Sequence, residues 1–212
     1  MKIAIDGPAG SGKSTVAREV SKRLGIPYLN TGLVYRALAY IGMLEGLSIG
    51  EILEVFGKPF EVKIGVSTTE VFYRGEDISQ RLASEAVGER ASQIASIPEL
   101  RERINQFFRS LVKGQVVAEG RDAGTHIFPE ANLKIFLIAS AEERARRRYI
   151  QLREQGVEAI YDNILKAIVE RDERDKNRPL YPFEPAGDAI IIDTTHLTIE
   201  EVVEKIIGLI RE

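Results

Sequence analysis

The sequence predicts an α/β fold in which a parallel sheet is covered by helices on both faces. The first observation is that short apolar runs recur along the 212 residues and alternate with stretches of helical periodicity. Strands that are apolar throughout are typical of a sheet buried on both faces. The second observation is a glycine-rich segment directly after the first of these runs. Ligands of such sheets bind at the carboxyl ends of the strands, so the residues that follow each run are candidates for a site.

The expected strands of this sheet lie at residues 2–6, 27–29, 115–119, 133–139 and 189–193. A helix is expected from Lys13 to Leu24, because apolar residues recur there at helical spacing. Residues 58–78 break the alternation, since FEVKI and TEVFYRG alternate apolar and polar residues as small antiparallel strands do. We therefore expect a single domain over residues 1–212, with a small antiparallel insertion and no second core.

Composition and charge exclude several classes of protein. A formal net charge of −3 argues against a nucleic acid or membrane held by bulk electrostatics. The chain has no cysteine, which excludes disulfides, zinc thiolates and cysteine nucleophiles. No apolar run approaches the roughly 18 residues of a membrane span, and the first residues lead directly into a strand without room for a cleavable signal. We expect a cytoplasmic monomer that binds neither nucleic acid nor membranes.

The glycine-rich segment, GPAGSGKST, has the spacing of a phosphate-binding loop. Glycine lacks a Cβ, so the backbone can fold tightly and bring its N–H groups close to a ligand. Lys13 would reach the β and γ oxygens of a nucleoside triphosphate, and the Ser14 hydroxyl would ligate Mg²⁺. A plain glycine-rich turn is the alternative, and the strand and helix that flank the segment disfavour it. The residues expected to hold the nucleotide's phosphates here are Gly7, Pro8, Ala9, Gly10, Ser11, Gly12, Lys13, Ser14 and Thr15.

Two arginines follow the second and third expected strands. Arg36 lies on the first turns of a helix for which Thr31 is a plausible N-cap. Arg121 and Asp122 lie in EGRDAG, where two glycines frame the pair. At the end of a strand a guanidinium can take a phosphate through two hydrogen bonds, and a carboxylate can accept from a donor. The alternatives are a solvated surface arginine and a surface turn with a local salt bridge.

Residues 170–179, ERDERDKNRP, form a charged run that is in phase with a buried helix face. An apolar stripe continues into this run at spacings of three and four, through Ile164, Ile168, Arg171, Asp175 and Arg178. Burying several charges requires partners, and a polyanionic ligand supplies them. Pro179 is expected to end the helix. The alternative is a solvated helix face.

A second basic cluster, ERARRR at residues 143–148, lies early in the helix after the fourth expected strand. Arg144 and Arg148 are four residues apart and share a helix face. A helix that binds nucleic acid is the alternative. It is disfavoured because the chain is acidic overall and two glutamates precede the arginines.

The balance of residues favours phosphoryl transfer over hydrolysis or switching. A transferring phosphoryl group needs positioning and charge neutralisation more than a covalent partner, so arginines around a phosphate loop fit that chemistry. The sequence has no N-K-x-D motif, as a GTPase would need, and no catalytic Ser-His-Asp set. The two histidines, His126 and His196, lie far apart in the sequence.

These motifs together resemble one family. GPAGSGKST, NTGLVYR, SQIASIPELR, EGRDAGT, IFLIASAEERARRR and ERDERDKNR stand in the order found in bacterial cytidylate kinases, over almost the whole chain. The resemblance implies transfer of the γ-phosphoryl group of ATP, with Mg²⁺, to CMP or dCMP. It implies a P-loop kinase fold with a five-stranded parallel sheet flanked by helices. It also implies a nucleoside-monophosphate-binding region at about 31–93 with a β insertion at about 55–90, and a helical lid at about 147–160.

The same resemblance assigns roles to particular residues. The clamp on the acceptor phosphate falls on Arg36, Arg121 and Arg178, which with Lys13 would form the catalytic set. Ribose contacts fall on Arg171 and Asp175, the residues that read cytosine on Ser92, Arg101 and Asp122, and a further acceptor contact on Thr31. The arginines that close over ATP would come from Arg144, Arg147 and Arg148. Two departures are Asn30-Thr31, where the family often has Asp-Ser or Asp-Thr, and Glu119, where Asp is frequent. Either Glu119 or Asp6 would hold the waters around Mg²⁺.

Other functions stay open at this point. A nucleoside monophosphate kinase that prefers UMP or AMP, a small-molecule kinase such as shikimate kinase, and a non-catalytic nucleotide switch all use such a loop. A switch needs one triphosphate pocket, whereas Arg36, Arg121 and Arg178 indicate a second anion. The set Ser92, Arg101 and Asp122 and the insertion favour cytidylate.

Overall fold

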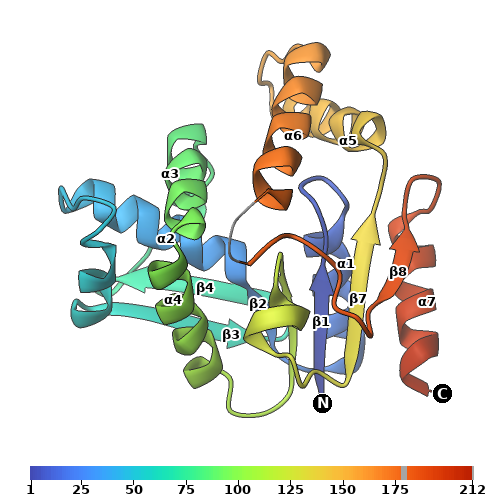
Figure 1. Ribbon diagram of the computed structural model, residues 1–212, viewed down its shortest axis with the longest axis horizontal. Coiled ribbons are helices and arrows are strands. Elements are labelled where there is room, and N and C mark those ends of the chain that lie inside the picture. Colours follow the sequence, from blue (N-terminus) through green and yellow to red (C-terminus); the bar gives the residue numbers. More distant parts are fainter. Residues whose placement is uncertain (178–180, 212) are drawn as a thin grey trace.

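The computed structural model describes residues 1–177 and 181–211 of the chain. Its centre is a five-stranded parallel sheet in the order β2-β6-β1-β7-β8 (Figure 1). The strands are β1 Lys2–Asp6, β2 Tyr28–Asn30, β6 Val116–Gly120, β7 Leu133–Ile138 and β8 Ile190–Asp193. The predicted α/β fold with five parallel strands is confirmed, and each observed strand overlaps the expected one.

Alternate residues of β1 point into two different cores. Ile3 and Ile5 belong to the cluster formed with α1 (Lys13–Leu24) and α7 (Ile199–Arg211), whereas Ala4 belongs to the cluster formed with α2 (Thr31–Leu44) and α4 (Pro98–Leu111). Successive side chains of a strand point to opposite faces, so a strand that is apolar throughout must be covered on both. This burial fixes the sheet between two helical layers.

The register of the sheet brings three chain segments to one edge. Asp6, the last residue of β1, pairs with Gly120 of β6, and Asn30, the last residue of β2, pairs with Glu119. The carboxyl ends of these three strands are therefore level. The glycine-rich loop, the start of α2 and the segment after β6 begin side by side.

A second, three-stranded antiparallel sheet follows α2. It contains β3 Phe60–Gly65, β4 Thr68–Tyr73 and β5 Glu76–Asp77, in that order. Thr69 ties it to the main sheet, because its hydroxyl donates to the carbonyl of Tyr28 at 2.8 Å and accepts from the N–H of Asn30 at 2.9 Å. The small sheet occupies the middle of the expected insertion, whose last residues belong to α3 (Glu85–Ser96).

One of two expected helix boundaries differs from the sequence-based expectation, and the other falls on an undescribed residue. The N-cap of α2 is Asn30 and not Thr31, because the Asn30 side chain accepts from the N–H of Leu33 at 2.9 Å. The helix over the charged run, α6 (Tyr161–Lys176), ends before Pro179, which lies outside the described residues. The expected lid begins inside α5 (Ala141–Glu154) and runs to the start of α6.

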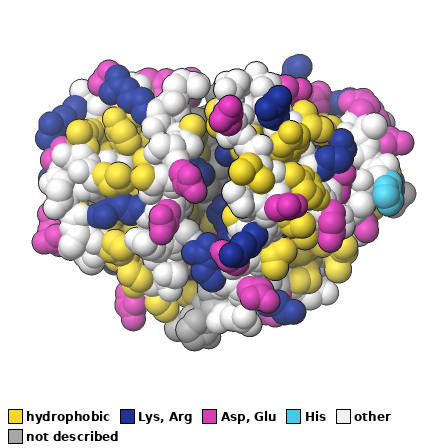
Figure 2. Space-filling view, turned by 90° about the horizontal axis from the view of Figure 1, so that it is seen from above, with side chains coloured by type: hydrophobic (Ala, Val, Ile, Leu, Met, Phe, Trp, Pro, Cys, Tyr) yellow, Lys and Arg dark blue, Asp and Glu magenta, His cyan; other side chains and the backbone are white. Residues whose placement is uncertain are grey.

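The remaining elements gather into two lobes around the sheet edge. In Figure 1, α2, α3 and the small sheet lie to the left of the main sheet, and α5 and α6 lie above it, over the loop after β1. The space-filling view from above shows a furrow between the lobes, with Lys and Arg side chains in it and beside it (Figure 2). No helix in the described part of the chain is long and apolar enough to cross a membrane.

Candidate active site

The loop after β1 has the backbone of an anion cradle. Gly10 and Gly12 have φ angles of 78° and 88°, a region that glycine adopts without strain. A Cβ on Gly7 would lie 2.6 Å from the carbonyl oxygen of Leu137, so the loop packs directly onto β7. Gly12 is also the residue before the first turn of α1. No side chain caps this helix start, which leaves its first N–H groups suited to binding an anion.

Lys13 lies in an environment that disfavours its charge. Burial lowers the pKa of Lys13 to about 8, and the positive charges of Arg121 and Arg171 lower it further, whereas Glu119 and Asp6 act in the opposite sense. Its Nζ donates to the carbonyl oxygen of Pro8 at 3.2 Å. A cluster of cations around a buried lysine is stabilised by an anionic ligand.

The sequence does not decide whether Asp6 or Glu119 holds the waters around Mg²⁺, and these two carboxylates have different partners. Both oxygens of Asp6 accept from the backbone, from the N–H of Ala123 at 2.9 Å and of Gly124 at 2.8 Å. Burial raises the pKa of Asp6 to about 7, although these hydrogen bonds oppose the rise. Oε1 of Glu119 accepts instead from the Ser14 hydroxyl at 2.7 Å. Of the two, Glu119 is hydrogen-bonded to the expected metal ligand.

The donors around Ser14 fit a magnesium ion. Mg²⁺ prefers oxygen ligands and is usually held by one or two protein groups together with substrate phosphates and water. A serine hydroxyl and the carboxylate of Glu119 lie together beside the loop. Among the described residues no three histidines, cysteines or carboxylates are grouped so that they could hold a metal ion.

A buried ion pair lies on the other side of the furrow. The Asp122 carboxylate accepts from Nε of Arg101 at 2.9 Å and from Nη2 at 2.8 Å, and Nδ2 of Asn105 lies 3.4 Å away. Both side chains are at most 4% exposed. Burial by itself raises the pKa of Asp122, but the charge and hydrogen bonds of Arg101 outweigh it and hold the pKa below its usual range. Ser92 lies half-buried on α3.

Arg121 and Asp175 meet although they lie on different elements. Nη1 of Arg121, directly after β6, is 2.8 Å from Oδ2 of Asp175 on α6. Asp175 and Ile168 are buried, and Arg171 is half-buried, so the inward stripe expected from the sequence is present on α6. Two residues expected to contact different parts of one nucleotide are thus in direct contact.

Arg36 and Thr31 lie on α2 and contact the segments beside it. Nη1 of Arg36 donates to the carbonyl oxygen of Leu82 at 2.9 Å, and the guanidinium lies against Gly88 of α3, where a Cβ would come within 2.8 Å of it. Burial lowers the pKa of Arg36, and so do the charges of Arg171 and Arg148. The buried Thr31 hydroxyl donates to the carbonyl oxygen of Glu119 at 2.9 Å. Arg178 lies outside the described residues.

Arg144 connects α5 to the glycine-rich loop. It is buried, and its guanidinium donates to the carbonyl oxygen of Ala9 at 3.2 Å and to both oxygens of Asp172, at 3.2 and 2.5 Å. Asp172 lies on α6. Arg144 is therefore a structural link among the loop, α5 and α6 in this conformation.

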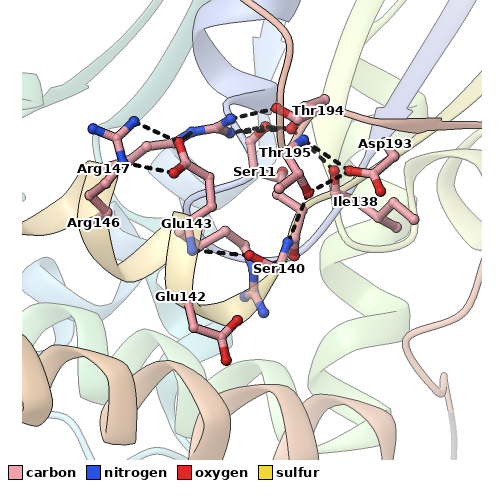
Figure 3. A network of polar contacts seen from close by, with 12 residues as sticks. Ser11, Ile138, Ser140, Glu142, Glu143, Arg146, Arg147, Asp193, Thr194 and Thr195 are labelled. Atoms are coloured by element: carbon pink, nitrogen blue, oxygen red, sulfur yellow. Dashed lines mark hydrogen bonds and ion pairs between the residues drawn. The ribbon is translucent and has the colours of Figure 1, made fainter.

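Arg147 makes a second link to the loop. Its guanidinium lies between Glu143 and Thr194 and donates to Oε1 of Glu143 at 2.9 Å and to the carbonyl oxygen of Thr194 at 2.5 Å (Figure 3). Nη1 of Arg147 also reaches the carbonyl oxygen of Ser11 at 3.5 Å. Arg148, in contrast, is exposed and donates to Gln151. The three lid arginines thus have three different environments.

Comparison with known proteins identifies the family. The family model described as Cytidylate kinase matches residues 3–212. The chain belongs to the cytidylate kinase family. A relative from Aquifex aeolicus (strain VF5), named Cytidylate kinase, is 54% identical and covers 100% of this chain and 96% of its own. One of that name from Azotobacter vinelandii is 46% identical, with 97% of this chain and 93% of its own covered.

Solved structures share the fold of this cytidylate kinase family member. Shikimate kinase from Bacteroides thetaiotaomicron has a TM-score of 0.50 at 16% identity, covering 100% of this chain and 99% of its own. Shikimate kinase from Acinetobacter baumannii, in complex with shikimate, has a TM-score of 0.50 at 19% identity, with 99% and 92% covered. At such identities the likeness extends to the fold alone.

Sequence reasoning missed several residues that contact the expected site. Phe183 lies over the Arg121 guanidinium, Tyr181 faces Arg101, and the Tyr28 hydroxyl donates to Glu119 at 3.2 Å. Thr194 was missed as the partner of Arg147. The available signal was the pair of aromatic residues in YPFEP, directly after the charged run.

Proposed function

We propose that the protein transfers the γ-phosphoryl group of ATP to CMP or dCMP, giving ADP and CDP or dCDP. The observation that carries this proposal is the convergence of cations on one furrow: Lys13, beside the glycine loop, feels the positive charges of Arg121 and Arg171. When one anion is bound at the glycine loop, arginines remain that can bind a second anion. Family membership supports the same reaction.

Each half of the furrow would hold one nucleotide. The loop from Gly7 to Thr15 would bind the ATP phosphates through backbone N–H groups, with Lys13 on the transferring group. Arg36 and Arg121, together with Arg178, would hold the acceptor phosphate. Because the charge of the transition state is spread over the transferring oxygens, fixed cations on both sides stabilise it more than they stabilise the reactants.

Mg²⁺ would enter with ATP and be held through Ser14. The hydrogen bond between the Ser14 hydroxyl and Glu119 supports Glu119, and not Asp6, as the carboxylate that orders the metal's waters. Bound there, Mg²⁺ would neutralise phosphate charge during the transfer. Asp6 would keep the turn after β6 in place through its two backbone hydrogen bonds.

Asp122 and Arg101 would read the cytosine ring with Ser92. The amino group at C4 of cytosine is a donor, which an ionised carboxylate accepts, whereas uracil presents a carbonyl oxygen there. A site built to pair with one hydrogen-bonding group discriminates strongly against its opposite. The pKa of Asp122, held below its usual range, keeps the carboxylate in the accepting form. Arg171 and Asp175 would contact the ribose.

Two regions would move around this site. The acceptor would bind against residues 31–93, and residues 147–160 would close over ATP, with Arg144, Arg147 and Arg148 drawn toward its phosphates. Closure excludes water and so suppresses hydrolysis of ATP. We propose that the protein does this as a cytoplasmic monomer, since all the groups invoked belong to one chain.

A coupled assay of ADP release across CMP, dCMP, UMP and AMP tests the proposal. We expect the highest kcat/KM with CMP or dCMP and a much lower one with UMP and AMP. Equal values with all four would refute the cytosine preference. Release of ADP that no acceptor accelerates would refute the kinase activity and favour a nucleotide switch. Sedimentation at micromolar concentration tests the monomer.

A further inference from the structure

After α6 the chain passes back across the acceptor side of the furrow. We call residues 181–183 the aromatic strap, because Tyr181 and Phe183 alternate along it and each contacts an arginine. The two arginines are Arg101 and Arg121, the ones expected to meet the base and the acceptor phosphate. Neither aromatic residue has an assigned role in this site.

Phe183 fixes one face of the Arg121 guanidinium. The carbon at the centre of the guanidinium lies 4.9 Å from the centroid of the Phe183 ring, and Nη1 of Arg121 is 2.8 Å from Oδ2 of Asp175. The N–H of Phe183 donates to the carbonyl oxygen of the same Asp175 at 3.1 Å. The side chain of Arg121 is 13% exposed. The Phe183 ring and the Asp175 carboxylate therefore fix the plane of the Arg121 guanidinium together, and these two residues are themselves hydrogen-bonded.

Tyr181 does the same for Arg101. The Arg101 guanidinium lies 6.0 Å from the Tyr181 ring and 5.8 Å from the Tyr35 ring, while its nitrogens pair with Asp122. Tyr35 comes from α2, so rings from two distant parts of the chain meet on one guanidinium.

The strap is held in place by contacts of its own. The Tyr181 hydroxyl donates to Oε2 of Glu102 at 2.9 Å, and its ring meets the His126 ring edge-to-face at 4.5 Å. The Phe183 ring packs on Phe136 of β7 with centroids 5.1 Å apart. Tyr181 has a φ of 59°, which a tyrosine adopts at a cost and keeps when its surroundings determine the conformation. These contacts make the strap a fixed support.

We infer that the aromatic strap positions the acceptor nucleotide's two arginines, Phe183 orienting Arg121 for the phosphate and Tyr181 orienting Arg101 for the base. This inference rests on the proposed function. An arginine side chain loses considerable rotamer freedom when it binds, and a guanidinium already stacked on a ring loses less. The strap therefore acts on acceptor affinity, and it leaves the ATP loop untouched.

The test replaces the Phe183 ring and keeps its apolar bulk. Phe183→Leu removes the ring from Arg121 but still packs on Phe136, and Phe183→Tyr restores a ring. We expect Phe183→Leu to weaken CMP binding, measured by calorimetry without ATP, about three- to tenfold, since a partly desolvated cation–π contact has that strength. KM for CMP should rise by a similar factor, and KM for ATP should not change. Phe183→Tyr should restore both the binding of CMP and the KM for CMP.

A matched control comes from the amino-terminal end of β1. The Phe128 ring lies 4.9 Å from Nζ of Lys2, so Phe128→Leu removes a similar contact outside the acceptor region. We expect it to leave CMP binding as in the unchanged protein. A Phe183→Leu protein with a lowered unfolding temperature but unchanged CMP affinity would show a purely structural role and overturn the inference. Failure of the unchanged protein to bind CMP would instead refute the proposed function.

Discussion

Replacing Asp122 by alanine separates the energetics of the base site from those of the ATP loop. Asp122 accepts both guanidinium contacts of Arg101, at 2.9 and 2.8 Å, and the two side chains are 4% and 3% exposed. Asp122→Ala leaves the Arg101 charge buried with its principal anion removed. Breaking a buried pair in this way costs about 3–5 kcal/mol of unfolding free energy. At ordinary slopes this lowers the midpoint of urea unfolding by about 1–3 M.

In the proposed function, the same substitution removes the acceptor for the cytosine amino group. A hydrogen bond to a charged group is worth about 1.5–3 kcal/mol, so KM for CMP should rise about 10- to 100-fold. KM for ATP should change little, because the glycine loop contacts neither Asp122 nor Arg101 in the described structure. Steady-state assays with each nucleotide varied in turn measure the two constants.

A double variant distinguishes stability from recognition. Arg101→Met with Asp122→Ala removes both charges and keeps an unbranched apolar side chain between the Tyr35 and Tyr181 rings. We expect it to recover much of the lost stability and none of the CMP affinity. Glu76→Ala breaks the exposed pair with Arg81 and should cost under about 1 kcal/mol. Equal rises of KM for CMP and ATP in Asp122→Ala, or a double variant no more stable than the single one, would refute this reasoning.

Three further predictions follow from other parts of the site. Lys13→Ala should lower kcat about 100- to 1,000-fold with an unchanged circular dichroism spectrum; near-normal turnover would contradict the role of this lysine. Gly88→Ala places a Cβ within 2.8 Å of the Arg36 guanidinium, so KM for CMP should rise while the unfolding temperature stays level or rises, since alanine favours a helix. Hydrogen bonds from Arg146 and Arg147 lower the pKa of Glu143 to about 2, so its stabilising contribution is complete above about pH 4.5 and is lost as pH falls toward 2. Glu143→Gln should therefore flatten the acid limb of the unfolding free energy, and an unaltered limb would place the acid sensitivity elsewhere.

The sequence alone determined the layers of the fold and the identity of the phosphate loop. Apolar runs such as residues 2–6 have no polar face, so they form strands only where helices cover both sides. The glycines at 10 and 12 are needed where φ is positive, and the structure has them at 78° and 88°. The buried stripe from Ile168 to Asp175 could likewise be predicted, because the phase of a helix is a local property of the sequence.

Tertiary structure decided which polar groups meet. Ser14 and Glu119 are 105 residues apart and share a 2.7 Å hydrogen bond, which separates the role of Glu119 from that of Asp6. No local sequence pattern predicts that Ser14 contacts Glu119 and not Asp6, because this contact depends on the register of β6 beside β1. Asn30, and not Thr31, caps α2, because the Asn30 side chain accepts from the N–H of Leu33 whereas the Thr31 hydroxyl donates to the carbonyl oxygen of Glu119 on β6.

The packing of distant elements also determines the contacts of the arginines on α5 and of the aromatic strap. Arg144 and Arg147 have similar sequence surroundings, yet one contacts Asp172 and the other Thr194, because α5 presents them to different neighbours. Phe183 and Tyr181 contact arginines that lie far from them in the sequence, a pairing that only the folded chain brings about. Sequence periodicity fixes which face of an element is buried, and only the packing of distant elements fixes the partner that each side chain finds there.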